Sequence, residues 1–351
     1  MEKARVIIAD TDVNYILSLQ QKFIEEFFEK IDLEIITDKE YLKQMFTKPQ
    51  SAELLIVSED LYDLSFQKHN IGTVFLMMEQ YDENEMTDSS VNRIFKYTSI
   101  NELFNEILGK GAEALRVENY AKKTQIVVVT SAAGGVGKTT VAMGLSACLA
   151  KNYKKVLYLN AEQLQTFQYM MQNAVPVTAN EIYADITNQD EKIYHDIKYI
   201  IRKETFNYVP PFKASLMSLG IPVSFFKNLA LGARDSNDYD YIVIDTDIVF
   251  DEEKAQLIDI ADKVIVVTKQ NRASVYATNL LVSNINGVNS DKYIFVCNDF
   301  NDEHSNALIS PDIVKRFNIA EYVRHLSYYD QLKSNDLANE KDIQKIAVLV
   351  V

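Results

Sequence analysis

A glycine-rich loop between a strand and a helix is the stretch of the sequence best suited to chemistry. It reads Gly134-Gly135-Val136-Gly137-Lys138-Thr139-Thr140 and follows the β-branched run 126–130. Glycines let successive backbone N–H groups converge on an anion, and the start of a helix adds its positive dipole end. The Lys138 ammonium would hold outer phosphates, and the Thr139 hydroxyl would bind Mg²⁺. Residues 134–140 therefore predict a phosphate-binding site, the alternative being a glycine-rich turn that binds nothing.

The loop resembles the deviant Walker A loop of the MinD/ParA family of P-loop ATPases. The plain pattern G-x-x-x-x-G-K-[ST] is not met, because Ala132 stands where the first glycine would be. The family's signature lysine, which reaches the partner subunit's nucleotide across a dimer, would stand at Ala133. The resemblance implies ATP or ADP with Mg²⁺ as cofactors, Lys138 as a catalytic residue and a homodimer. Ala133 predicts slow or absent hydrolysis.

The same resemblance extends to residues that end three later strands. The run YDYIVIDTD (239–247) resembles the family's Walker B strand, so Asp245 is expected to hold Mg²⁺ beside Thr139. Glu162 stands at the second acid of the family's D-x-D and would orient water, or else is a solvated glutamate, while Asn160 replaces the first acid. Asn298 matches the asparagine that reads the adenine edge, or else caps a turn.

Alternating strands and helices predict two doubly wound α/β domains. In the first, strands are expected at 5–10, 33–37, 54–58, 73–78 and 93–96, with a helix capped by Asp12 and a closing helix at 100–108. We expect Gly109-Lys110-Gly111 to break that closing helix. The predicted organisation is a flavodoxin-like domain at 1–108, a linker at 109–123 and a P-loop domain at 124–351.

The first domain resembles response-regulator receiver domains. Asp10 matches an acidic position after the first strand, and Lys96 falls near the lysine that follows the fifth. Ser58 stands where the phosphoacceptor aspartate should be, with Glu59 and Asp60 following it. A side chain one place late points to the opposite side of a strand. The domain is therefore interpreted as a pseudo-receiver for recognition or dimerisation, and a working receiver is the alternative.

Composition narrows the class of protein. The net charge of −14 disfavours nucleic acid as a partner. No apolar run approaches the roughly eighteen residues of a membrane span, and the start of the sequence has no signal-peptide pattern. The two cysteines fall in predicted core elements, which is typical of a protein in a reducing cytoplasm. The four histidines are scattered without metal-ligand spacing, so no histidine-based metal site is expected. The apolar residues 343–351 are interpreted as a packed segment, with a membrane-targeting helix as the alternative.

A receiver-like domain ahead of such an ATPase resembles the TadZ/CpaE proteins of Tad/Flp-type pilus assembly. The resemblance implies a cytoplasmic, ATP-bound dimer that localises pilus or secretion machinery proteins, often at a cell pole, with any membrane association indirect. A cycling ATPase of the cell-division or partitioning kind is the second hypothesis. A regulator that responds to phosphorylation of its first domain is the third.

Overall fold

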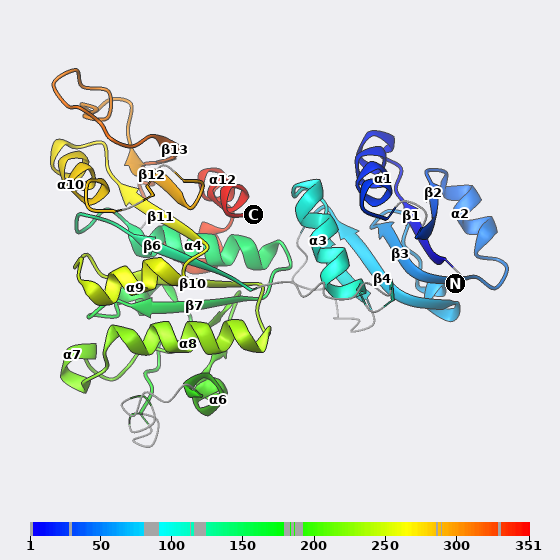
Figure 1. Ribbon diagram of the computed structural model, residues 1–351, viewed down its shortest axis with the longest axis horizontal. Coiled ribbons are helices and arrows are strands. Elements are labelled where there is room, and N and C mark those ends of the chain that lie inside the picture. Colours follow the sequence, from blue (N-terminus) through cyan, green and yellow to red (C-terminus); the bar gives the residue numbers. More distant parts are fainter. Residues whose placement is uncertain are drawn as a thin grey trace. The chain divides into compact units, whose positions relative to one another are not determined.

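The chain divides into two compact units, residues 1–122 and 123–350. The computed structural model describes residues 3–27, 30–80, 91–112, 114–115, 124–178, 183, 186, 192–285, 287–288, 290–328 and 331–351. Most of the predicted linker, residues 116–123, lies outside these ranges. Each unit is described by itself (Figure 1).

The first unit is built on a parallel sheet. Its described strands are β1 (Ala4–Ala9), β2 (Ile31–Ile36), β3 (Ser51–Ser58), β4 (Asn70–Met78) and β5 (Val91–Phe95). They pair in the order β2-β1-β3-β4-β5, and every pairing is parallel. This is the flavodoxin-like order that the alternation of elements predicts.

Helices cover both faces of this first sheet. The described helices are α1 (Val13–Phe27), α2 (Lys39–Met45), the short 3₁₀ helix η1 (Leu64–Lys68) and α3 (Ile100–Gly111). As predicted, Asp12 caps α1, because its Oδ1 accepts hydrogen bonds from the backbone N–H groups of Asn14 and Tyr15. Helices α1 and α3 bury their apolar residues against β1, β3 and β4. On the other face, α2 contacts β2 and η1 contacts β4.

The closing helix of the first unit is longer than predicted. Helix α3 runs to Gly111, so the expected break at Gly109-Lys110-Gly111 is wrong. Gly111 packs so closely that a Cβ there would lie 3.1 Å from Leu54 Cδ2. Burial of Leu103, Ile107 and Leu108 holds the last turn in place. Tertiary packing therefore outweighs the roughly 1 kcal/mol by which glycine disfavours a helix.

The second unit contains a larger sheet, whose strands are labelled β6 to β13 where there is room (Figure 1). Its described strands are β6 (Gln125–Thr130), β7 (Val156–Ala161), β8 (Arg202–Lys203), β9 (Asn207–Tyr208), β10 (Tyr241–Thr246), β11 (Lys263–Thr268), β12 (Tyr293–Phe300) and β13 (Ile319–Arg324). They pair in the order β13-β12-β11-β6-β10-β7-β9-β8. All pairs are parallel except the short β8–β9 pair. The carboxyl ends of the parallel strands therefore meet at one edge, where ligands bind in such sheets.

Helices pack on both faces of this second sheet as well. They are α4 (Lys138–Lys151), η2 (Thr166–Met170), α6 (Ile193–Ile197), η3 (Lys198–Ile200), α7 (Leu216–Leu219), α8 (Val223–Ser236), α9 (Glu252–Ile260), α10 (Arg272–Val282), α11 (Ser334–Leu337) and α12 (Lys341–Val350). One core joins α6, α8, α9 and α10 to the sheet. Helix α4 packs against β6, β7 and β10 and is covered by α11 and α12.

The C-terminal segment is a packed helix. Helix α12 buries Ile343, Ile346, Ala347 and Val350. Gly144 of α4 allows this approach, because a Cβ there would lie 3.0 Å from Ile343 Cγ2. The interpretation of residues 343–351 as a packed segment is confirmed. Among the described residues, none of the helices has the length and apolar character to cross a membrane.

Candidate nucleotide site

The glycine-rich loop has the backbone conformation of an anion cradle. Gly135 and Gly137 have positive φ angles of 66° and 89°, which residues other than glycine rarely adopt. Gly137 is the N-cap residue of α4 and has no side chain that could accept a hydrogen bond from the helix's first N–H groups. Those donors and the positive end of the helix dipole are left for a ligand. The loop between β6 and α4 therefore has the local structure that a phosphate site requires.

Glu162 lies directly against the loop. It follows β7, and its Oε1 lies 3.5 Å from Lys138 Nζ. Its Oε2 accepts a hydrogen bond of 3.4 Å from the Thr139 hydroxyl. Burial raises the pKa of Glu162, while Lys138 opposes that rise. The fold thus brings together three side chains that sequence reasoning assigned to one site, and Glu162 is no solvated strand end.

Asp245 ends β10 in a fully buried position. Its Oδ2 accepts hydrogen bonds of 3.0 Å from both the Tyr158 hydroxyl and the Asn160 amide. The amide of Asn160 also donates to the Tyr158 hydroxyl at 3.1 Å. Asp245 Oδ1, in contrast, is buried and has no hydrogen-bond partner within the described part of the chain. One carboxylate oxygen is therefore fixed by neighbours and the other is left open.

The electrostatics around Asp245 fit a cation. Burial, together with the nearby Glu162 charge, raises the pKa of Asp245 to about 7. The Thr139 hydroxyl and Lys138 lie close enough to oppose it. A buried carboxylate with an open oxygen beside a hydroxyl matches the oxygen ligands that Mg²⁺ prefers. Thr139 and Asp245 are thus the residues that would hold a magnesium ion, which would neutralise phosphate charge there.

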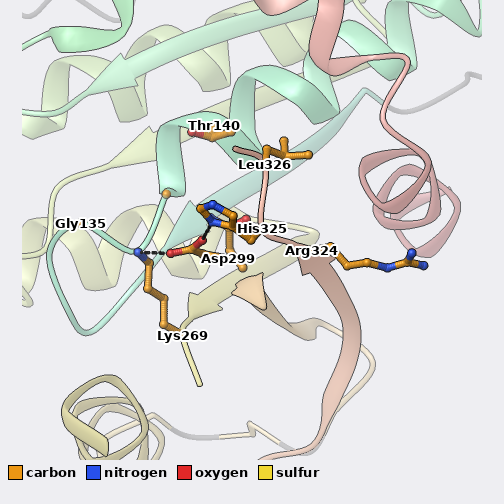
Figure 2. Close-up of a pocket in the computed structure, with 9 residues that line it drawn as sticks. Gly135, Thr140, Lys269, Asp299, Arg324, His325 and Leu326 are labelled. Atoms are coloured by element: carbon orange, nitrogen blue, oxygen red, sulfur yellow. Dashed lines mark hydrogen bonds and ion pairs between the residues drawn. The ribbon is translucent and has the colours of Figure 1, made fainter. Parts of the chain in front are cut away.

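A cavity of about 160 Å³ opens on the other side of the loop. Figure 2 shows it, with Lys269 and His325 both converging on Asp299. Lys269 Nζ lies 2.7 Å from Asp299 Oδ2, and His325 Nδ1 lies 2.6 Å from Asp299 Oδ1. Burial alone would raise the pKa of Asp299, but these two partners lower it. The three residues follow or end β11, β12 and β13, so they fasten together the strand ends that line the cavity.

Asn298 lines the same cavity, and its amide is already in use. Asn298 Nδ2 donates a 2.8 Å hydrogen bond to the Val136 carbonyl. A Cβ at Gly137 would lie only 2.1 Å from that nitrogen. Asn298 thus braces the loop, and its carbonyl oxygen is the group left for a base. Thr140 also lines this cavity, on the first turn of α4.

Sequence reasoning missed several residues of the two sites: Tyr158, Lys269, Asp299, Arg324, His325 and Leu326. Lys269 and His325 directly follow strands, so the rule that sites lie at the carboxyl ends of parallel strands would have found them. Tyr158 lies inside a buried strand and gives no such signal in the sequence. Only strand order brings its hydroxyl to Asp245.

The first unit has its own cluster at the strand ends. Lys96 Nζ donates hydrogen bonds of 3.2 Å to Asp10 Oδ1 and 3.1 Å to Glu79 Oε1, and it forms an ion pair with Asp10 Oδ2 at 3.0 Å. Burial alone would lower the pKa of Lys96, but these hydrogen bonds reverse the effect and raise it. Ser58 donates a 2.5 Å hydrogen bond to Asp60 Oδ1. The turn that follows β3 thus brings the Asp60 carboxylate to the position where a phosphoacceptor aspartate would stand in a receiver domain.

Comparisons with known proteins agree with this geometry. Residues 124–296 match the family model of the AAA domain. The putative septum site-determining protein MinD of Emiliania huxleyi is 28% identical over 153 residues, 43% of this chain and 54% of that protein. The chain spans about half the length of the curated relatives it matches.

Solved structures show the same fold. The ParA family ATPase of Chlorobium tepidum is similar with a TM-score of 0.51 and 14% identity, over 65% of this chain and 99% of that one. The MinD protein of Pyrococcus horikoshii, complexed with Mg-ADP, gives a TM-score of 0.50 and 15% identity, over 65% and 94% of the two chains.

The second unit therefore has the fold of the MinD/ParA P-loop ATPases. The match of residues 124–296 to the AAA domain model and the likeness to these solved structures agree on that fold. The resemblance seen in the loop and in the strand that carries Asp245 is in accord with the shared fold.

Proposed function

We propose that this protein binds ATP·Mg²⁺, dimerises, and serves as a localisation or assembly factor for a Tad/Flp-type pilus or secretion system, with slow or absent hydrolysis. The observation that carries nucleotide binding is the open Oδ1 of the buried Asp245, set beside Thr139 at the glycine loop. A buried polar atom without a partner is costly unless a ligand completes it. ATP·Mg²⁺ supplies both the cation and the phosphates for which this loop is shaped.

Two residues support slow turnover. Ala133 offers no ammonium to a partner subunit's nucleotide. The Asn160 amide is held by Asp245 and Tyr158, so it is not free to orient an attacking water. Charge stabilisation at the transferred phosphate is the main source of catalysis in such enzymes, and part of it is missing here.

Exposed apolar side chains beside the glycine loop support dimerisation. Ile248, Val249 and Phe250 follow the strand that carries Asp245 and are exposed, and so are Leu164 and Met217. A Cβ placed on Gly134 would lie 4.0 Å from Ile248 Cδ1, so this apolar surface borders the proposed phosphate site. An exposed apolar surface of this kind is typical of a protein–protein interface. A second copy of the chain that binds there, over the nucleotide, would link dimerisation to ATP.

The order of the two units supports the pilus branch of the family. The first unit's strand order is that of receiver domains, while its Lys96 is already paired with Asp10 and Glu79. Ser58 at the acceptor position favours a recognition role over phosphotransfer. The net charge of −14 favours protein partners over nucleic acid, and such partners would recruit the protein to the inner face of the membrane or to a cell pole.

A cycling MinD/ParA-type ATPase for cell division or partitioning is the second candidate. The contact of Glu162 with Lys138 and Thr139 favours it, because a carboxylate there is within reach of a water near the phosphates. The names of the similar proteins, MinD and ParA, fit this candidate equally well.

The test is nucleotide binding and turnover by the purified full chain, with its mass followed in solution. We expect ATP·Mg²⁺ to bind, to convert monomer into dimer and to persist for hours. The variant Lys138→Ala should weaken binding about 100-fold or more, because it removes a buried cation from the phosphates. Lys151→Ala at the other end of α4 is the matched control and should bind normally.

Rapid turnover that Lys138→Ala abolishes would favour the cycling ATPase over the assembly factor. No nucleotide binding by the unaltered chain would refute both.

A further inference from the structure

A second lysine is buried next to the phosphate site. Lys254 lies in α9 with only 4% of its surface exposed. Its Nζ donates a hydrogen bond of 2.5 Å to the Asp247 carbonyl oxygen. This is the one hydrogen bond recorded for that ammonium among the described residues. Because an ammonium carries three donors, two of them have no recorded acceptor. Buried donors without acceptors are costly, so such a lysine calls for a further partner.

The ammonium borders a cavity of about 280 Å³. Lys254, Asp247 and Asp251 line it, together with Ala161 and Thr246. Ala161 immediately precedes Glu162, and Thr246 immediately follows Asp245. The cavity therefore begins at the backbone of the two strand ends that carry the proposed site. It is a separate space from the cavity lined by Asn298 and Asp299.

Charge links Lys254 to the glycine loop. Burial, reinforced by repulsion from Lys138, lowers the pKa of Lys254 to about 8. Asp247, Asp251 and Glu162 oppose that lowering. Two buried ammonium groups that repel each other are unfavourable in the free protein, and an anion between them would relieve the repulsion.

We propose that Lys254 is a second cation of the phosphate site, which contacts the terminal phosphate of a nucleoside triphosphate from within the same chain. The inference rests on the proposed function and deepens it, because it assigns a residue to discrimination between triphosphate and diphosphate. In the free protein the Asp247 carbonyl holds the ammonium. With a triphosphate, the terminal phosphate competes for the same donors. The loop at 247–251 would then respond to the terminal phosphate, since Lys254 ties that loop in its present position.

The experiment compares the affinities of the full chain for AMPPNP and ADP, both with Mg²⁺. AMPPNP keeps a terminal phosphate that is not cleaved, so binding is measured apart from turnover. We expect Lys254→Met to weaken AMPPNP binding about tenfold more than ADP binding, the effect of one lost charge-assisted hydrogen bond. Lys254→Arg should keep the preference, because it keeps the charge.

The matched control is Lys227→Met. Lys227 lies in α8 and bonds Gln256 of α9 at 2.9 Å, so it also links α9 to its surroundings without bordering the cavity. It should leave both affinities unchanged. An equal loss for AMPPNP and ADP with Lys254→Met, or no loss for either, would show that Lys254 only fastens the loop and would overturn the inference.

A second measurement covers the case in which Lys254→Met does not fold. The unaltered chain is treated with an amine-acetylating reagent, and the modification of Lys254 is quantified by mass spectrometry of its peptides. Protection by AMPPNP several-fold greater than by ADP supports the contact, and equal protection overturns it. If the unaltered chain binds neither nucleotide, the proposed function itself fails, which is a distinct result from binding without discrimination.

Discussion

Each unit of this protein places a lysine and buried carboxylates at the carboxyl ends of parallel strands, but the two sites are completed differently. In the first unit, Lys96 lies within 3.2 Å of both Asp10 oxygens and also bonds Glu79. In the second, Lys138 lies 3.5 Å from Glu162, and Asp245 keeps a buried oxygen without a partner among the described residues. In the first cluster even Asp10 Oδ2, which accepts no hydrogen bond among the described residues, lies 3.0 Å from the Lys96 ammonium. Among the same residues Asp245 Oδ1 has neither a hydrogen bond nor an ion pair, so the second cluster leaves an acceptor for a ligand.

The difference shows how one topology serves two purposes. Strand ends in a parallel sheet gather polar side chains whether or not a ligand is to be bound. A cluster whose members satisfy one another holds a fold together, because its charges have been neutralised within the protein. A cluster with open atoms and a glycine cradle is arranged for a ligand. The following predictions test this contrast, beginning with the largest expected effect.

Removing the lysine of the first cluster should destabilise only the first unit. Lys96→Met leaves Asp10 buried and charged without its cation, at a cost of about 3 kcal/mol or more. Hydrogen exchange of the full chain, followed on the amides of β1 and β3, measures this loss. Lys43→Met, which breaks an exposed pair with Glu40, is the control and should change nothing.

Pairing Lys96→Met with Asp10→Asn should recover part of the lost protection, because no buried charge remains. Nucleotide binding should stay normal throughout. Loss of nucleotide binding in Lys96→Met would mean that the two sites are not independent, and the contrast would not stand.

The open carboxylate of the second cluster should make binding of Mg²⁺·nucleotide depend on pH. With the pKa of Asp245 raised to about 7, binding should weaken about tenfold from pH 8 to pH 6, because a proton competes with the cation. Stability shows the matching sign. The folded-state pKa exceeds the ordinary value near 4, so the protonated group stabilises the nucleotide-free unit below about pH 4. That contribution is lost as pH rises through 7.

Calorimetric titrations between pH 6 and pH 8 measure this dependence. Asp245→Asn should bind more weakly and lose the part of the pH dependence that exceeds the nucleotide's own protonation, which both proteins share. Asp235→Asn on the exposed side of α8 should retain it. Identical pH profiles for the unaltered chain and Asp245→Asn would rule out Asp245 as the cation's ligand.

The smallest effect is expected at the rim of the base-side cavity. His325 is about half exposed and pairs with Asp299. Removing the imidazole still leaves the ion pair between Asp299 and Lys269, so the network stays partly intact. His325→Ala should weaken ATP binding only about two- to threefold. His304→Ala, an exposed histidine away from the cavity lining, is the control. A tenfold loss with His325→Ala would mean that the imidazole contacts the nucleotide itself.

Local sequence was enough to predict the conformation of the glycine-rich loop, where we propose that phosphates bind. The loop 134–140 is defined by neighbouring residues, since glycine's freedom at positive φ and the start of a helix act over a few positions. The alternation of strands and helices was likewise sufficient to predict parallel sheets and the strand order of the first unit. Asp12 as the cap of α1 followed from the same short-range rules.

Predictions became less accurate where packing competes with local preference. Glycines at 109 and 111 suggested a break, but the fit of Gly111 against Leu54 keeps α3 helical. The apolar residues 343–351 suggested no particular helix, yet α12 forms there and buries its apolar side chains, with Ile343 packed closely over Gly144 of α4.

What the sequence by itself determined is the resemblance of the second unit to the MinD/ParA proteins, the position of its glycine-rich loop and the residues near the ends of its strands. Tertiary structure alone decided which of those residues meet. Asn160 and Tyr158 reach Asp245 across a separation of more than eighty residues because β7 pairs with β10. Lys269, Asp299 and His325 join because β11, β12 and β13 are neighbours. Local preference fixes backbone conformation, whereas contacts between distant side chains depend on strand order and register, which only the complete fold sets.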